Sequence, residues 1–172
     1  MRIAFVIPAH NEELLIGRTV AACMAAGREL GEPFEVIVVV SGTDRTAAIV
    51  REQFADQHDP EVQVIELEGL ALPGRARNAG LAAARGDYVS FPGSHVVLPP
   101  GSLAARIRAH ERGYPMVTGT IRNLTATRAG WASYFLDHGT VLPGRPSEEL
   151  AVAPPHCSYD RELLLTVGGF PE

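Results

Sequence analysis

The chain has 172 residues, of which 46% are hydrophobic and 20% charged, and its formal net charge is −5. This length suits one domain with its own core, and the composition is ordinary for a soluble globular protein. The negative charge and the lack of a basic stripe argue against a nucleic-acid partner. No apolar run approaches the roughly 20 residues of a membrane-spanning helix, and no signal-peptide pattern opens the chain, so we expect a cytoplasmic location.

Short apolar runs alternate with helix-like segments through the first half of the chain. Each run is nearly continuous, as expected for a parallel strand buried on both faces. The expected strands cover residues 2–7, 34–40, 62–67 and 87–91, and the expected helices cover residues 12–27, 44–57 and 74–85. Pro8 is expected to end the first strand, and Asn11 and Asp44 to cap the first two helices. The alternation predicts a parallel sheet joined by right-handed crossovers.

The pattern is looser after Pro100. We expect helices over residues 101–113, 130–138 and 161–167, strands over 116–121 and 150–154, and a loop over 142–150. The helix at 130–138 carries the only tryptophan and looks amphipathic. His110 and His138 are interpreted as structural. Together these elements predict an α/β fold.

Polar segments follow several of the expected strands. They are the residues 8–12 (PAHNE), 41–46 (SGTDRT) and 92–95 (PGSH), and the start of the helix at 74–85 adds Arg75 and Arg77. Taken alone, each segment is explained about as well or better by a helix cap, a turn or a solvated surface. In open α/β sheets, however, ligands bind beyond the carboxyl ends of the strands. Their shared position therefore indicates one binding cleft.

The side chains in these segments allow more than one chemistry. Arg75 and Arg77 point in different directions, so at most one of them faces the cleft, where a guanidinium suits phosphate or a base carbonyl. His95 could ligate a metal, act as an acid or base, or be a polar surface residue. His156 and Cys157 are adjacent, and adjacent residues rarely act as base and nucleophile, so we reject a cysteine hydrolase and favour acceptor binding or packing there.

The order and spacing of these segments resembles the family 2 glycosyltransferases. The resemblance rests on VIPAHNEE, VVVSGTDRT, GRARNAGLAAARGDYVSF, PPGSL and SYDRELLLTVGGFPE, and it covers essentially the whole chain. The third of these motifs is the most specific. The resemblance implies a GT-A fold, that is, a three-layer α/β/α sandwich with a mainly parallel sheet. It also implies transfer of a sugar from a nucleotide-diphosphate sugar to an acceptor hydroxyl, with inversion.

The resemblance also implies roles for individual residues. Pro8, Ala9, His10 and Glu12 would line the nucleoside pocket, and Arg77 would reach the base or the diphosphate. Asn78 would brace the loop, and Ser94 and His95 would belong to the donor-site loop. The family has an aspartate pair at the end of its second strand, where this chain has Val39 and Val40, which leaves Ser41 as the nearest polar substitute.

Two further departures concern the chemistry. The family holds a divalent cation, Mg²⁺ or Mn²⁺, with an Asp-x-Asp element, where this chain has Gly93, Ser94 and His95. His95 remains as a candidate ligand for a softer metal, or it donates directly to the diphosphate. The family's general base is an Asp or Glu beyond the GGF segment, which the resemblance cannot assign to any residue here. We therefore expect a truncated N-terminal portion with little or no transferase activity alone.

These expectations define one GT-A-like domain over residues 1–172. Its nucleotide-sugar-binding part covers about 1–100 and the start of an acceptor-side part covers about 101–172. The expected partners are a nucleotide-diphosphate sugar and an unidentified hydroxyl acceptor, which could be a glycan, a lipid or a small molecule.

The alternative is a non-catalytic nucleotide-sugar-binding module that has lost its metal site. A nucleotidyltransferase would need a Gly-rich basic loop after the first strand, which PAHNEE is not. A missing remainder could bring the cytoplasmic chain to a membrane surface.

Overall fold

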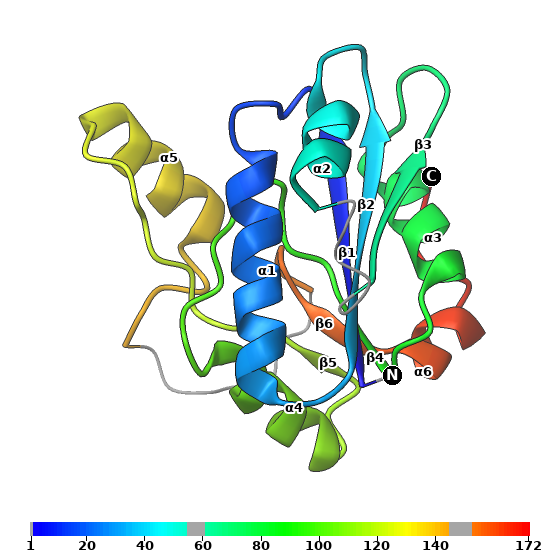
Figure 1. Ribbon diagram of the computed structural model, residues 1–172. Helices are drawn as coiled ribbons and strands as arrows, with labels where there is room; N and C mark the ends of the chain where they lie inside the picture. The colour runs from blue at the N-terminus through cyan, green and yellow to red at the C-terminus, as the bar shows by residue number, and fades with distance from the viewer. Residues whose placement is uncertain (1, 55–60, 145–152) are drawn as a thin grey trace.

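One mixed sheet forms the centre of the molecule. A computed structural model describes residues 2–54, 61–144 and 153–172 (Figure 1). Within these ranges the sheet has the strand order β3-β2-β1-β4-β6-β5. Its strands are β1 Ile3–His10, β2 Phe34–Ser41, β3 Glu61–Glu66, β4 Tyr88–Ser90, β5 Met116–Val117 and β6 Ser158–Asp160. Strands β1 to β4 are parallel, whereas β6 runs antiparallel to both β4 and β5.

Helices cover both faces of the sheet. They are α1 Ile16–Leu30, α2 Thr46–Phe54, α3 Pro73–Ala83, α4 Ser102–Glu111, α5 Arg128–His138 and α6 Arg161–Thr166. Apolar residues of α1, α2 and α4 pack on one face, and those of α3 and α6 on the other. The arrangement is the predicted three-layer sandwich. Helix α5 stands away from these layers (Figure 1). Among the described residues, no helix is both long enough and apolar enough to span a bilayer.

The buried strands explain why the apolar runs in the sequence are continuous. In β1, Phe5 and Ile7 pack in the cluster that includes α1 and α4, whereas Ala4 and Val6 pack in the cluster on the α3 side. Successive strand residues point to opposite faces, so a strand covered on both faces must be apolar at every position. The prediction of buried parallel strands is confirmed.

Strand β1 is longer than predicted. It continues through Pro8 to His10, and Pro8 lies opposite Val39 of β2. Proline cannot donate a hydrogen bond and is therefore tolerated where a strand lacks a partner on one side. The ladder between β1 and β4 ends at Phe5, so Pro8 lies where β1 is paired only with β2. The extension carries His10 to the carboxyl edge of the sheet.

The first helix begins later than predicted, and Asn11 does not cap it. Helix α1 starts at Ile16, after Leu15, whose side chain offers no cap. Asn11 has a φ of 53°, in the left-handed region that asparagine tolerates better than most residues. Its Oδ1 atom accepts hydrogen bonds from the backbone N–H groups of Thr43 and Asp44, at 3.0 and 3.3 Å. Asn11 therefore joins two loops instead of starting a helix.

The second half departs most from the predictions. The strand expected at 116–121 is only the two-residue β5. Of the strand expected at 150–154, residues 153 and 154 are not in a strand, and the rest lies outside the described residues. The expected end of the second helix, at 55–57, and most of the loop expected at 142–150 also lie outside them. Strand β6 was not predicted, because three residues are too few to show a period. Helix α5 buries Tyr134 but exposes Trp131, Phe135 and Leu136, so it lacks the core-facing stripe expected of an amphipathic helix.

Candidate functional site

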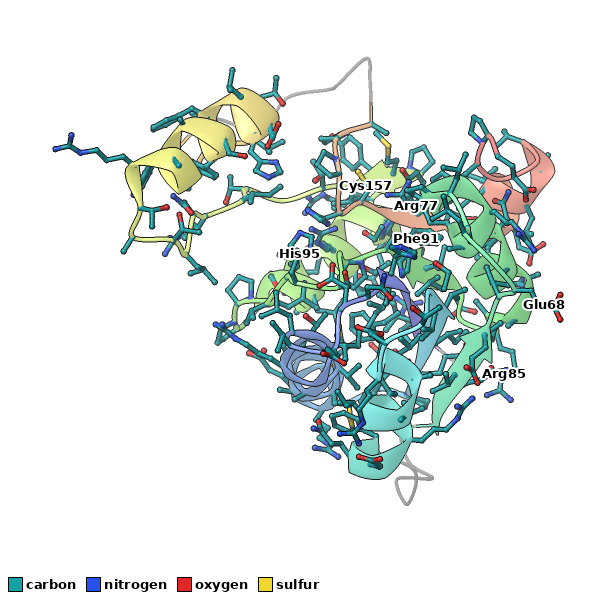
Figure 2. All side chains as sticks on the ribbon, turned by 90° about the horizontal axis from the view of Figure 1, so that it is seen from above. Glu68, Arg77, Arg85, Phe91, His95 and Cys157 are labelled. Carbon is teal, nitrogen blue, oxygen red and sulfur yellow. The ribbon has the colours of Figure 1, made fainter. Side chains whose placement is uncertain are left out.

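Loops from three neighbouring strands meet at the carboxyl edge of the sheet. They follow β1, β2 and β4, whose parallel directions bring their ends together. Figure 2 looks onto the molecule from above, and toward the middle of this view lie His95, Phe91, Arg77 and Cys157. The edge of an open α/β sheet where strand ends diverge is the usual place for a ligand.

The loops after β1 and β2 are locked together by backbone-to-side-chain hydrogen bonds. The N–H of Glu12 donates to Thr46 Oγ1 at 2.9 Å, and the N–H of Glu13 donates to Asp44 Oδ2 at 3.0 Å. Asp44 Oδ1 also accepts the N–H of Thr46 at 2.9 Å, so Asp44 caps the start of α2 as predicted. With the bonds of Asn11, these contacts make the two loops one unit. Sequence reasoning identified the Asp44 cap but neither the role of Asn11 nor this cross-linking.

His10 and Ser41 occupy the ends of β1 and β2. They are register partners, and His10 Nδ1 lies 3.0 Å from Ser41 Oγ. The Asn11 side-chain amide lies 3.4 Å from His10 Nε2. In the tautomer in which Nε2 accepts from that amide, Nδ1–H donates to Ser41. Ser41 is buried, whereas His10 is exposed at the edge of the sheet.

Pro8 and Ala9, which precede His10 in β1, present little side chain at this edge of the sheet. The side chain of Ala9 is 3% exposed and packs in the core with α1. Pro8 is half-buried. A nucleotide at this edge would therefore meet the backbone of Ala9 and not its side chain.

Glu12 connects the β1 loop to the loop after β4. Ser94 Oγ donates to Glu12 Oε1 at 2.8 Å, and His95 Nδ1 lies 3.5 Å from the same oxygen. The carbonyl of Ser94 accepts a hydrogen bond from Thr19 Oγ1 of α1 at 2.8 Å. Three of the residues that the sequence assigned to the site, Glu12, Ser94 and His95, are thus brought together. Ser94 is buried and His95 exposed.

Arg77 and Asn78 of α3 meet the GGF segment near the end of the chain. Arg75 is exposed, whereas the guanidinium carbon of Arg77 lies over the Phe170 ring at 5.3 Å from its centroid. Within the described residues, no carboxylate comes within ion-pair distance of Arg77. Asn78 Nδ2 donates to the Phe170 carbonyl at 2.8 Å, and Asn78 Oδ1 accepts the Phe170 N–H at 2.9 Å. Asn78 therefore fixes the residue on which Arg77 rests.

His156 joins the site, although the sequence indicated only acceptor binding or packing for it. Its Nδ1 atom accepts the N–H of Gly93 at 3.0 Å, and its carbonyl accepts a hydrogen bond from Arg106 Nη1 at 2.8 Å. Burial lowers the pKa of His156 to about 4, and nearby cationic side chains act in the same direction. These side chains are His95, His138, Arg106 and Arg77. The ring is therefore neutral near pH 7, with its proton on Nε2.

Cys157 behaves as a packed residue. Burial raises the pKa of its thiol, and the thiol donates to the Pro154 carbonyl at 3.0 Å. The neighbouring His156 uses Nδ1 for Gly93. A buried thiol with a raised pKa is a poor nucleophile, which agrees with the rejection of a cysteine hydrolase. His110 is also structural as predicted, since it is buried and hydrogen-bonded to Tyr114 and Ser158.

His156 should make the stability of the fold depend on pH. Its folded pKa of about 4 lies below its ordinary value of 6.5, so its stabilising contribution is complete above pH 6.5 and is lost as the pH falls toward 4. His110, whose pKa burial also lowers, acts with the same sign. After allowance for solvent around the ring, we expect a loss of about 1 kcal/mol in unfolding free energy between pH 7 and pH 5. Urea unfolding at both pH values measures it.

The His156→Gln variant is the control for this pH dependence. It removes the titrating group, so its unfolding free energy should change less between pH 7 and pH 5 than that of the unaltered chain. Equal slopes for the two proteins would show that His156 does not titrate as its environment implies.

The residues of this site do not fit the metal arrangement that the resemblance implies. In the ranges that the structure describes, no group of three or more His, Cys, Asp or Glu side chains could hold a metal ion. Among the residues that the structure describes, the only carboxylate in contact with the loop at 93–95 is that of Glu12, which Ser94 and His95 share. Mg²⁺ and Mn²⁺ prefer several oxygen ligands, carboxylates above all. The assignment of His95 as a metal ligand stays a prediction.

Comparison with known families identifies the fold and its lineage. The profile described as "Glycosyl transferase family 2" matches residues 4–164. The chain belongs to this family. The match extends from β1 into α6, so it includes every strand of the sheet and all the loops at its carboxyl edge. The resemblance drawn from the sequence motifs is confirmed.

Curated relatives share the family over part of their length. An undecaprenyl-phosphate 4-deoxy-4-formamido-L-arabinose transferase of Pectobacterium carotovorum subsp. carotovorum (strain PC1) is 35% identical over 127 residues, which are 70% of this chain and 36% of the relative. The succinoglycan biosynthesis protein ExoO of Rhizobium meliloti (strain 1021) is 35% identical over 113 residues, covering 64% and 30% respectively. The chain thus spans about a third of the relatives' length.

Solved structures share the fold. The mannosyltransferase PcManGT from Pyrobaculum calidifontis, solved with GDP-Man and Mn²⁺, superimposes with a TM-score of 0.71 at 22% identity, over 99% of this chain and 47% of the other. S. aureus TarS 1-349 in complex with UDP-GlcNAc gives a TM-score of 0.70 at 22% identity, over 99% and 49%. The predicted GT-A fold is confirmed.

Proposed function

We propose that this chain is the nucleotide-sugar-binding part of an inverting glycosyltransferase. Residues 1–100 would form the donor side, and residues 101–172 would begin the acceptor side. The sugar would pass from a nucleotide diphosphate to an acceptor hydroxyl. Membership of glycosyl transferase family 2 supports the reaction class.

One observation carries the donor-site assignment. The loops after β1, β2 and β4 meet at the carboxyl edge of the sheet and share hydrogen bonds through Glu12 and Asn11. Above them, His10 and His95 are exposed, and Arg77 has no carboxylate partner in the described part of the chain. An unpaired guanidinium beside exposed imidazoles at this edge suits the charge of a diphosphate.

The proposed roles follow the positions of the side chains. His10 and Ser41 lie at the ends of β1 and β2, where a nucleoside would contact the edge of the sheet. Glu12 can accept hydrogen bonds from a base or ribose. Arg77, Ser94 and His95 would face the diphosphate. Asn78 acts indirectly, by fixing Phe170 under Arg77. Two of the solved neighbours hold GDP-Man and UDP-GlcNAc, so both guanine and uracil donors deserve testing.

A non-catalytic binding module is the second candidate. The observation that favours it is the absence of the Asp-x-Asp carboxylates at residues 93–95. Both candidates require a nucleotide-sugar site, so they share the first experiment. They differ in whether an acceptor receives the sugar. Besides a hydroxyl compound, a polyprenyl phosphate is an acceptor to test, because curated relatives are named undecaprenyl-phosphate transferases.

Calorimetric titration of the 172-residue chain with UDP and GDP tests the shared site. We expect one of them to bind with a Kd between about 10 μM and 1 mM, and the matching nucleoside without phosphates to bind more weakly. The difference reports the contribution of the diphosphate. No heat of binding with either nucleotide, under any metal condition, would contradict the donor-site assignment.

A further inference from the structure

We propose that the chain holds the diphosphate of its donor without a divalent cation. Positive charge would come from Arg77, and hydrogen bonds from Arg77, His95 and His156, which gather around the turn at residues 93–95. The inference rests on the proposed donor site and names how that site binds its anion. Three features of the structure support it.

The first feature is the space beside Gly93, where the family places a carboxylate. A Cβ atom at position 93 would lie 2.8 Å from His156 Cε1 and 3.4 Å from its Nδ1. Real Cβ atoms essentially never approach a neighbour within 3.0 Å, so a side chain at 93 requires the imidazole to move. The ring of His156 thus fills the place into which the first aspartate of an Asp-x-Asp element would project.

His156 is held firmly in that place. Its ring accepts the Gly93 N–H at 3.0 Å, and its carbonyl accepts a hydrogen bond from the buried Arg106 at 2.8 Å. Its φ of 64° lies in the left-handed region, which is unfavourable for a residue with a side chain. A strained backbone with both ends of the residue anchored indicates that the surroundings select this position. The ring is not a loose side chain that a cation could displace.

The second feature is the balance of charge around the turn. Glu12 supplies the only carboxylate that contacts it in the described residues, and that group already accepts a hydrogen bond from Ser94 and lies 3.5 Å from His95 Nδ1. On the positive side, Arg77 stacks on Phe170, and the hydrogen bonds of Arg106 go to the carbonyls of Val117 and His156. Two guanidinium groups, those of Arg77 and Arg106, therefore lie near the turn, against one contacting carboxylate among the described residues. Such a site attracts an anion and repels a divalent cation.

The third feature is the set of hydrogen-bond donors. Because His156 Nδ1 accepts from Gly93, its Nε2 carries the proton and can donate. The ring of His95 is exposed, with its Nδ1 toward Glu12, which leaves Nε2 for a ligand. The guanidinium of Arg77 adds a planar group of donors that matches phosphate oxygens. These groups supply to a diphosphate the hydrogen bonds and the charge that a metal would otherwise supply.

Titration of the full chain with UDP or GDP, whichever binds, tests the inference in EDTA and again with Mg²⁺ or Mn²⁺. We expect Kd values in these conditions to agree within about threefold. A gain of about tenfold or more on adding either metal would overturn the inference while leaving the donor site in place. An absence of binding in every condition would instead overturn the proposed function.

A pair of variants tests which groups hold the diphosphate. His95→Ala should weaken binding by about tenfold in EDTA and in Mn²⁺ alike, because a donor is lost whether or not metal is present. Arg108→Ala is the matched control, since it removes a cation from the exposed face of α4 and should leave the Kd unchanged. If His95→Ala binds as tightly as Arg108→Ala, the imidazole does not hold the anion and the inference fails. Circular dichroism confirms that both variants are folded.

Discussion

Replacing Arg77 with alanine is expected to weaken nucleoside diphosphate binding by about 10- to 100-fold. Arg77 is half-buried at the carboxyl edge of the sheet, over Phe170, and has no carboxylate partner among the described residues. A charge-assisted hydrogen bond to phosphate contributes roughly 1.5–3 kcal/mol, and Arg77 can make more than one. Calorimetry with the nucleotide that binds the unaltered chain measures the loss.

Two further variants separate the geometry of Arg77 from its charge. Arg77→Lys keeps the positive charge but loses the planar fork, so it should recover only part of the affinity. Arg75→Ala removes an exposed arginine two residues away on the same helix and should bind as the unaltered chain does. Equal affinities for the Arg75→Ala and Arg77→Ala variants would show that Arg77 lies outside the donor site.

The order of elements in the first half could be predicted from the sequence because it depends on local patterns. Strands buried on both faces are apolar at every position, and each helix between them is long enough to show its own period. Strand β6 could not be predicted, since it has three residues and depends on its partners β4 and β5. Asn11 was assigned to the wrong element for a related reason. Its hydrogen-bond partners, Thr43 and Asp44, are distant in sequence, and a capping residue looks the same whether it serves its own helix or another loop.

The candidate site likewise has a part that could be predicted from the sequence and a part that could not. The segments after the first two strands, the helix with Arg77 and the loop with His95 could be selected because strand ends are predictable from strand positions. His156 could not be selected, because its contact with Gly93 joins residues 63 positions apart. The one available signal was the glycine that replaces the first family aspartate. A glycine at a site where side chains are usual suggests that another group occupies the space, but only the fold identifies that group as His156.

Asn78→Ala is expected to lower the unfolding free energy by about 2–4 kcal/mol, the largest stability effect that we expect from a residue of the site. The Asn78 side chain bonds both the N–H and the carbonyl of Phe170, at 2.9 and 2.8 Å, and its Nδ2 lies 3.0 Å from Glu172 Oε1. Truncation leaves two part-buried backbone groups without these partners. Chemical denaturation, monitored by circular dichroism, gives the change. Asn123→Ala is the matched amide control, because within the described part of the chain Asn123 accepts a single hydrogen bond, from the nearby Thr125 N–H. It should cost less than about 1 kcal/mol.

The same substitution separates a structural role from a positioning role. Phe170 packs edge-on against Phe91 and Tyr159 and carries Arg77 on its face, so release of its backbone removes the support of the guanidinium. Asn78→Ala should therefore weaken nucleotide binding at temperatures well below its unfolding transition, while the Asn123→Ala control does not. Combining Asn78→Ala with Arg77→Ala should cost less affinity than the sum of the single losses, since both changes act through one guanidinium. Additive losses would show that Asn78 stabilises the fold without positioning Arg77.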